Sequence, residues 1–208
     1  MPTSAVRSRV VLIAGPSGSG KSTLAARLGW PVVRLDDFYR DGDDPALPRD
    51  AQGRVDWDHP GAWLADDALA AITTLAHRGS ARLPVYEIGQ DRRVGDRELR
   101  LGGAPLFLAE GLFADRLVEP CRRAGLLADA LVLAPSKPVT FVRRLHRDLA
   151  EARKPLRVLL GRGVRLWREH SSVVLRCVAA GMRRTTPEQA RIELGSLATR
   201  PVDEALVG

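Results

Sequence analysis

The stretch GPSGSGKST, Gly15 to Thr23, follows directly after the apolar run RVVLIA and constrains the fold more than any other part of the sequence. It fits the pattern G-x-x-x-x-G-K-[ST], in which a glycine-rich loop joins a buried strand to a helix. Glycines let backbone N–H groups approach phosphate oxygens closely, and the helix start adds partial positive charge. The pattern therefore predicts a phosphate-binding loop. The alternative, a glycine- and serine-rich linker, leaves the apolar run before it and the helical pattern after it unexplained.

Each polar residue of this loop has an expected role. Lys21 is expected to reach the β- and γ-phosphates of a nucleotide, and the Ser22 hydroxyl is expected to bind Mg²⁺. The expected nucleotide-binding residues are Gly15, Ser17, Gly18, Ser19, Gly20, Lys21, Ser22 and Thr23. The loop therefore predicts ATP or GTP, with Mg²⁺, as the cofactors.

Short apolar runs alternate with helical patterns along the chain. Strands are expected at 9–14, 31–35, 105–110 and 130–134, and helices at 22–28, 61–77, 114–125, 139–152 and 187–198. Such alternation predicts an α/β fold with three layers, in which helices cover a central, mainly parallel sheet. Together with the phosphate-binding loop, the alternation predicts the P-loop NTPase fold. Residues 41–53 are expected to form a loop and 83–103 a small β excursion, while 171–180 fits either a strand or a helix.

Composition limits the class of protein. A chain of 208 residues with 45% hydrophobic content can bury the core of one domain. No apolar run approaches the roughly 18 residues of a membrane span, and the first residues lack the apolar core of a secretory signal, which predicts a cytoplasmic protein without a membrane partner. Cys121 and Cys177 lack metal-binding spacing and are expected to be buried free thiols.

The chain is basic, with a formal net charge of +7 that comes mostly from arginine. The excess is concentrated in 141–170. Arginine-rich segments bind phosphates or nucleic acid, or simply form a solvated helix face. Nucleic acid is disfavoured here, because it would be repelled by acidic residues such as Asp36 and Asp58.

Acidic residues follow two of the expected strands. Asp36 and Asp37 come after PVVRL, and Glu110 closes PLFLA. Ligands of parallel sheets bind beyond the carboxyl ends of the strands. A carboxylate there can hold Mg²⁺, directly or through water, or accept a proton from an attacking hydroxyl. Capping of the next helix or loop is the alternative.

Further blocks carry a family resemblance. They are LDDFYR (35–40), VDWDHPGAW (55–63), LPVYE (83–87) and LAEGLF (108–113), with a looser match in RRLHRDLAEARK (143–154). Together with the phosphate-binding loop, they resemble the uridine kinase family of P-loop kinases, whose relatives include phosphoribulokinase and bacterial pantothenate kinase. The resemblance implies a single kinase domain over 1–208, with an acceptor-binding region at about 36–104 and a helical lid with its following helix at about 141–170.

The resemblance also implies roles for individual residues. Asp36 would take the proton from the attacking hydroxyl, and Glu110 would help to organise Mg²⁺. The acceptor would contact Tyr39, Tyr86 and, through its ribose hydroxyls, Asp58. The lid would bring Arg144 and Arg147 over the phosphates, where they would act with Lys21 in catalysis.

The implied activity is transfer of the γ-phosphate of ATP to the 5′-hydroxyl of uridine or cytidine. At Ile88 and Asp91 the chain lacks the aromatic residue and the histidine with which the family recognises the pyrimidine. Another nucleoside or a small hydroxylated metabolite is therefore an open alternative as acceptor. A nucleotide-binding regulator is a further alternative. Related enzymes often form homo-oligomers, so a homo-oligomer is possible here, but the sequence does not determine the oligomeric state.

Overall fold

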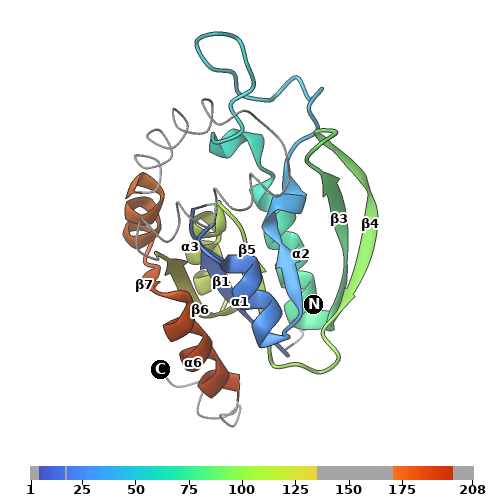
Figure 1. Ribbon diagram of the computed structural model, residues 1–208. Helices are drawn as coiled ribbons and strands as arrows, with labels where there is room; N and C mark the ends of the chain where they lie inside the picture. The colour runs from blue at the N-terminus through green and yellow to red at the C-terminus, as the bar shows by residue number, and fades with distance from the viewer. Residues whose placement is uncertain (1–4, 17, 135–170, 199–208) are drawn as a thin grey trace.

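The computed structural model describes residues 5–16, 18–134 and 171–198 (Figure 1). Its centre is a five-stranded sheet with the order β2-β5-β1-β6-β7, in which every neighbouring pair is parallel. The strands are β1 (Arg9–Ala14), β2 (Val32–Arg34), β5 (Leu106–Glu110), β6 (Leu127–Leu133) and β7 (Arg183–Thr185). The predicted parallel sheet is confirmed.

Helices cover both faces of this sheet. On one face lie α2 (Ala65–Arg78), α3 (Val118–Arg123) and the helical residues 171–179, and on the other lie α1 (Lys21–Leu28) and α6 (Pro187–Ala198). Strand β1 supplies alternate residues to the two apolar clusters, so it is buried on both faces. Burial on both faces explains why its sequence is a continuous apolar run. The predicted three-layer α/β fold is confirmed.

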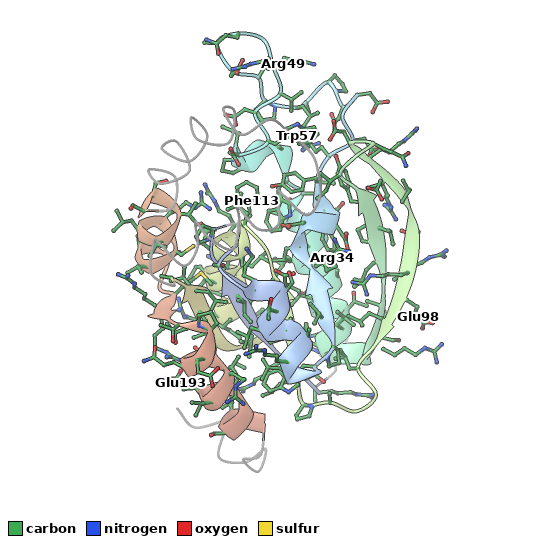
Figure 2. The ribbon with its side chains drawn as sticks, viewed as in Figure 1. Arg34, Arg49, Trp57, Glu98, Phe113 and Glu193 are labelled. Carbon is green, nitrogen blue, oxygen red and sulfur yellow. The ribbon has the colours of Figure 1, made fainter. Side chains whose placement is uncertain are left out.

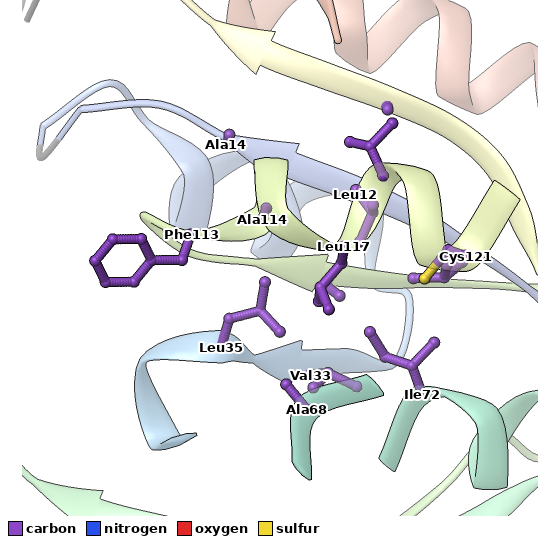
Figure 3. Packing of buried hydrophobic residues seen from close by; sticks show 14 of the residues in the cluster. Leu12, Ala14, Val33, Leu35, Ala68, Ile72, Phe113, Ala114, Leu117 and Cys121 are labelled. Atoms are coloured by element: carbon purple, nitrogen blue, oxygen red, sulfur yellow. The ribbon is translucent and has the colours of Figure 1, made fainter. Parts of the chain in front are cut away.

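The packing of α2 against β2 fixes the element that follows β2. Ala68 and Ile72 are fully buried on one side of α2, and Figure 3 shows them facing Val33 and Leu35. Their spacing of four residues places both on one helix face. Directly after β2, the chain forms a single turn of 3-10 helix, η1 (Leu35–Phe38), which carries Asp36 and Asp37.

The predicted β excursion is a hairpin at the edge of the molecule (Figure 1). Strands β3 (Ser80–Glu87) and β4 (Arg92–Arg100) pair antiparallel, with a shift of register between Val85 and Tyr86. The buried residues of β3 are Ala81, Leu83 and Tyr86, whereas β4 is largely exposed. The apolar packing of the hairpin therefore comes mainly from β3.

Several boundaries differ from those predicted. The helix expected at 61–77 begins at Ala65, after the 3-10 turn η2 (Pro60–Ala62), and the helix expected at 114–125 divides into η3 (Ala114–Leu117) and α3. The undecided residues 171–179 are helical. Strand β7 was not predicted, because Arg-Arg-Thr at a sheet edge has no apolar run.

The helix expected at 139–152 lies outside the described residues. Within the described ranges, no helix is both long enough and apolar enough to cross a membrane.

Candidate active site

A cavity of about 820 Å³ opens beyond the carboxyl ends of β1, β2 and β5. This is the edge at which ligands of parallel sheets bind, because the loops and helix starts that follow the strands meet there. The cavity is lined by Gly15, Gly18, Gly20, Lys21, Ser22, Thr23, Asp36, Tyr39, Trp57, Tyr86, Ile88, Asp91, Glu110 and Leu112. The phosphate-binding loop and the acids after β2 and β5 therefore share one space.

The phosphate-binding loop leaves the start of α1 open to a ligand. The helix begins at Lys21 behind Gly20, which has a left-handed conformation (φ 96°) and no side chain with which to cap the helix. The first N–H groups of a helix have no partner within the helix. They and the helix dipole favour an anion at this position.

Gly15 is required by crowding where β1 meets the loop. Its φ is 149°, and a Cβ there would lie 2.7 Å from Ser19 Oγ and 2.8 Å from the carbonyl oxygen of Leu133. Ser19 itself is fully buried. Any larger residue at position 15 would displace the loop.

The Lys21 side chain folds back over the phosphate-binding loop and contacts its first residues. Its Nζ donates to the carbonyl oxygens of Gly15, at 2.8 Å, and Pro16, at 3.4 Å. The ammonium is thus held beside the loop that is expected to carry phosphates, and its charge lies close enough to Glu110 to lower the pKa of that carboxyl.

Glu110 and Ser22 form the candidate metal site. Ser22 Oγ donates to Glu110 Oε1 at 3.0 Å, although the two residues lie 88 positions apart. Burial raises the pKa of Glu110; Lys21 and the Ser22 hydrogen bond oppose this rise, whereas Asp36 adds to it. A hydroxyl and a nearly buried carboxylate are the hard oxygen ligands that Mg²⁺ accepts, so these residues fit the predicted ion.

Asp36 is held in the cavity by the close approach of η1 to the end of β5. A Cβ at Gly111 would lie 2.7 Å from Leu35 Cβ and 3.0 Å from Asp36 Oδ1. Glycine at 111 therefore permits the carboxylate of Asp36 to sit beside Glu110. This role of Gly111 was not predicted, although the residue lies within the LAEGLF block.

Tyr39 is the centre of an aromatic group on the other side of the cavity. Its ring centroid lies 5.9 Å from that of Trp57, 6.1 Å from Tyr86 and 6.1 Å from Phe113. Figure 2 labels Trp57 and Phe113, which lie in the same upper region of the molecule. Burial, with added repulsion from Asp36 and Asp58, raises the pKa of Tyr39, so the phenol remains a hydrogen-bond donor.

The hairpin contributes Tyr86 to the same group. The irregularity between Val85 and Tyr86 in the β3–β4 pairing is of the kind that redirects a side chain near a site. Tyr86 is 7% exposed, and its hydroxyl donates to the carbonyl oxygen of Arg40 at 3.0 Å. Tyr86 thus joins the hairpin to the chain that follows η1.

Asp58 does not line the cavity. It is exposed, next to Trp57, which does line the cavity, and its charge acts on Tyr39. Its role as a ligand of ribose stays a prediction. His59 accepts a hydrogen bond from the N–H of Gly61 at 3.0 Å, and so caps the turn η2.

Asp37 points away from the cavity, unlike its neighbour Asp36. Its side chain is 3% exposed and lies between the guanidinium groups of Arg34, at 4.0 Å, and Arg97, at 3.9 Å. Burial raises its pKa, while Arg34, a hydrogen bond from the N–H of Tyr86, and Arg97 lower it. Asp37 was predicted to lie with Asp36 at the ligand site, but in the structure it links η1 to Arg97 of the hairpin.

A second link lies behind the cavity. Arg176 donates to the buried Asp115 through Nε, at 2.9 Å, and Nη2, at 3.3 Å, and to the carbonyl oxygen of Leu112, at 3.1 Å. No sequence signal identified this pair, because its members lie 61 positions apart. Three predicted site residues, Ser17, Arg144 and Arg147, lie outside the described residues.

Comparisons with known proteins agree with this geometry. The model of the phosphoribulokinase / uridine kinase family matches residues 10–154. A uridine kinase of Deinococcus deserti is 32% identical over 158 residues, which cover 72% of each chain. A uridine kinase of Lactobacillus helveticus is 26% identical over 155 residues, which cover 71% of each chain. The uridine kinase of Saccharomyces cerevisiae is 30% identical over 156 residues, which are 71% of this chain but 30% of the yeast protein.

The fold has a counterpart among solved structures. A protein described as a fructose transport system kinase from Silicibacter sp. TM1040 aligns with a TM-score of 0.52 at 18% identity, over 85% of this chain and 81% of that one. At this identity, the likeness is one of fold. The match over residues 10–154 and the match to the Deinococcus protein establish the family: the chain belongs to the phosphoribulokinase / uridine kinase family of P-loop kinases.

Proposed function

We propose that the protein transfers the γ-phosphate of ATP to the 5′-hydroxyl of a pyrimidine nucleoside, uridine or cytidine. The observation that carries the proposal is the shared cavity, which Lys21 lines on the side of the phosphate-binding loop and Asp36 and Tyr39 line on the side of the acceptor. A kinase needs both sites in one space, because the acceptor hydroxyl must meet the γ-phosphate directly. In a simple nucleotide switch, the aromatic residues Tyr39, Trp57 and Tyr86 on the acceptor side of the cavity would have no function.

The donor half binds and orients the triphosphate. The N–H groups of the loop and of the first turn of α1 hold phosphate oxygens, and Lys21 leaves its carbonyl partners to contact the β- and γ-phosphates. Ser22 and Glu110 would hold Mg²⁺, which neutralises phosphate charge when it is bound. GTP is the alternative donor, since none of these contacts reads the base.

The acceptor half positions the hydroxyl and takes its proton. The acceptor oxygen attacks the γ-phosphorus, the bond from that phosphorus to the β–γ bridging oxygen breaks, and the hydroxyl proton moves to the carboxylate of Asp36. Tyr39, Trp57 and Tyr86 give the base and sugar an apolar, partly aromatic wall. Asp58 would accept hydrogen bonds from the ribose hydroxyls, and Arg144 and Arg147 would close over the phosphates.

The alternative acceptor is another nucleoside or a small hydroxylated metabolite. It is favoured by the cavity-lining positions of Ile88 and Asp91, where a stacking ring and a histidine are missing. An acceptor that carries a phosphate or carboxylate fits less well, because Lys21 is the one basic residue among the described lining residues.

The test is ADP release from Mg·ATP with uridine, cytidine, other nucleosides, pantothenate or ribulose 5-phosphate supplied singly. The proposal predicts stimulation by uridine or cytidine well above the rate without acceptor. Stimulation by one of the other compounds alone would support the alternative. A panel without any stimulation would contradict a kinase of this class and favour a nucleotide-binding regulator.

A further inference from the structure

The tip of the β3–β4 hairpin forms part of the acceptor wall. Ile88 and Asp91, at the two ends of the tip, both line the cavity. Asp91 has φ 49°, and it is the one residue other than glycine with positive φ in the described part of the chain. Left-handed backbone costs free energy in residues with a Cβ, though Asp and Asn tolerate it better than most. Such a conformation persists only where surrounding contacts hold it.

Those contacts come from the segment that follows η1. The N–H of Gly42 donates to the carbonyl oxygen of Asp91 at 2.6 Å, and the N–H of Arg93 donates to Asp41 Oδ1 at 2.6 Å. A Cβ at Gly42 would lie 2.9 Å from Asp91 Cβ, so glycine is needed for this approach. These contacts hold the tip against the chain that carries Asp36 and Tyr39. The backbone of Asp91 is therefore held at the cavity.

The carboxylate of Asp91 is available to a ligand. Within the described ranges, the structure shows no hydrogen bond or ion pair to its oxygens. Burial first, then the charges of Asp91 and Asp41, raise the pKa of Tyr86 to about 12, which places the Asp91 charge near the Tyr86 phenol.

We propose that Asp91 determines acceptor specificity: it accepts a hydrogen bond from an amino group of the acceptor base and favours an amino-bearing nucleoside over its carbonyl-bearing counterpart. This inference rests on the proposed function and specifies the acceptor class of the same site. A carboxylate accepts hydrogen bonds and cannot donate one. An exocyclic amino group of the base can donate a hydrogen bond to the Asp91 carboxylate. A carbonyl group at the same position cannot, and it would place two hydrogen-bond acceptors against each other.

The size of the preference depends on the negative charge of the Asp91 carboxylate, which accepts the hydrogen bond. A hydrogen bond to a charged group is stronger than one between neutral groups, and we expect a preference of about tenfold in kcat/KM. Replacement of Asp91 by Asn retains the shape and the tolerance of positive φ, but gives the side chain an NH₂ group that can donate to a carbonyl. Asp91→Asn therefore isolates hydrogen-bond character from packing.

The experiment measures kcat/KM for two matched pairs, cytidine with uridine and adenosine with inosine. The wild type is expected to favour the amino member of the better-used pair by about tenfold, and Asp91→Asn is expected to bring this ratio close to one or reverse it, with KM for ATP unchanged. Asp43→Asn is the matched control, because Asp43 is exposed, lies in the segment that contacts the tip, and does not line the cavity. It should leave the ratio unchanged.

Two outcomes would overturn the inference alone: a wild type that uses nucleosides without favouring the amino member, or an Asp91→Asn variant that loses rate equally for both members. The second outcome is what a purely structural role of Asp91 would give. If none of the four nucleosides is phosphorylated by the wild type, the proposed function fails, and the inference fails with it.

Discussion

Lys21 and Asp36 lie on different elements but line one cavity. Replacing each of them should therefore change catalysis and ATP binding in different ways. Lys21→Ala removes a donor and charge next to the transferred phosphate, and a loss of one such group costs about 10²–10³ in rate. Asp36→Asn removes the proton acceptor, which should lower kcat by about 10²–10⁴ while ATP binding stays nearly normal. ADP release and equilibrium binding of ATP measure the two effects.

Asp43→Asn serves as the control for Asp36→Asn, because it removes an exposed carboxylate from the same region. Near-normal turnover in Asp36→Asn would show that another group takes the proton.

Asp37 gives a prediction about stability and pH. Since burial holds its pKa above the ordinary value of 3.8, the folded state retains a proton that the unfolded chain has already lost. Stability is therefore lost as pH rises from about 4 through the raised pKa. Asp37→Asn removes this contribution, so the melting temperature of the variant minus that of the wild type should increase between about pH 4 and pH 7.

Thermal melts of wild type, Asp37→Asn and Asp43→Asn over that range would check the sign. A difference that falls with rising pH would mean that Arg34 and Arg97 outweigh burial, and that Asp37 acts as an ordinary ion-pair partner.

At the residue scale, the sequence predicted the site residues whose positions depend only on nearby residues in the chain. The phosphate-binding loop, Asp36 and Glu110 lie at or just after the ends of strands, so their positions at one sheet edge could be inferred before the structure was known. The place of Asp91 at the cavity depends on the contact with Gly42, and the burial of Asp37 depends on Arg97, which lies 60 positions further along the chain. No spacing rule connects such residues.

At the scale of elements, the pair Arg176–Asp115 joins the helical residues 171–179 to η3. The Asp115 side chain is 3% exposed and that of Arg176 is 33% exposed. Arg176→Ala would leave a buried carboxylate without its partner, at a cost of about 1–3 kcal/mol in the free energy of unfolding. Urea denaturation measures this cost.

The matched comparison is Arg122→Ala, which breaks the pair Arg122–Glu119. Its side chains are 52% and 59% exposed at a separation of 3.1 Å. Pairs of this kind contribute at most about 1 kcal/mol, since water and salt screen them. Equal losses in the two variants would contradict a structural role for the Arg176–Asp115 pair.

The predicted elements were most accurate where one pattern extends over a whole element. The apolar run of β1 and the helix over 187–198 have the predicted bounds. Prediction was weaker where tertiary contacts decide the outcome. Leu35 to Phe38 turn into η1 because α2 and the end of β5 pack against that turn, and β7 forms only because β6 offers it a partner.

At the scale of the molecule, strand order explains the site. With β1 between β5 and β6, and β2 outside β5, the loop after β1 lies beside Glu110, and η1 lies on the other side of Glu110. The chain has a net charge of +7, yet the described lining of the cavity contains Asp36, Asp91 and Glu110 against Lys21. The basic excess therefore lies outside the acceptor wall, which fits an acceptor without a negative charge.

The most direct test of the account is identification of the reaction product. Wild-type protein incubated with Mg·ATP and uridine or cytidine should form the nucleoside 5′-monophosphate, identified by mass and by the phosphorus NMR signal of a 5′-phosphate, in equal amount to ADP. ADP formed without any phosphorylated nucleoside, or a phosphate found on another hydroxyl, would contradict the central claim that Asp36 activates the 5′-hydroxyl beside the phosphate-binding loop.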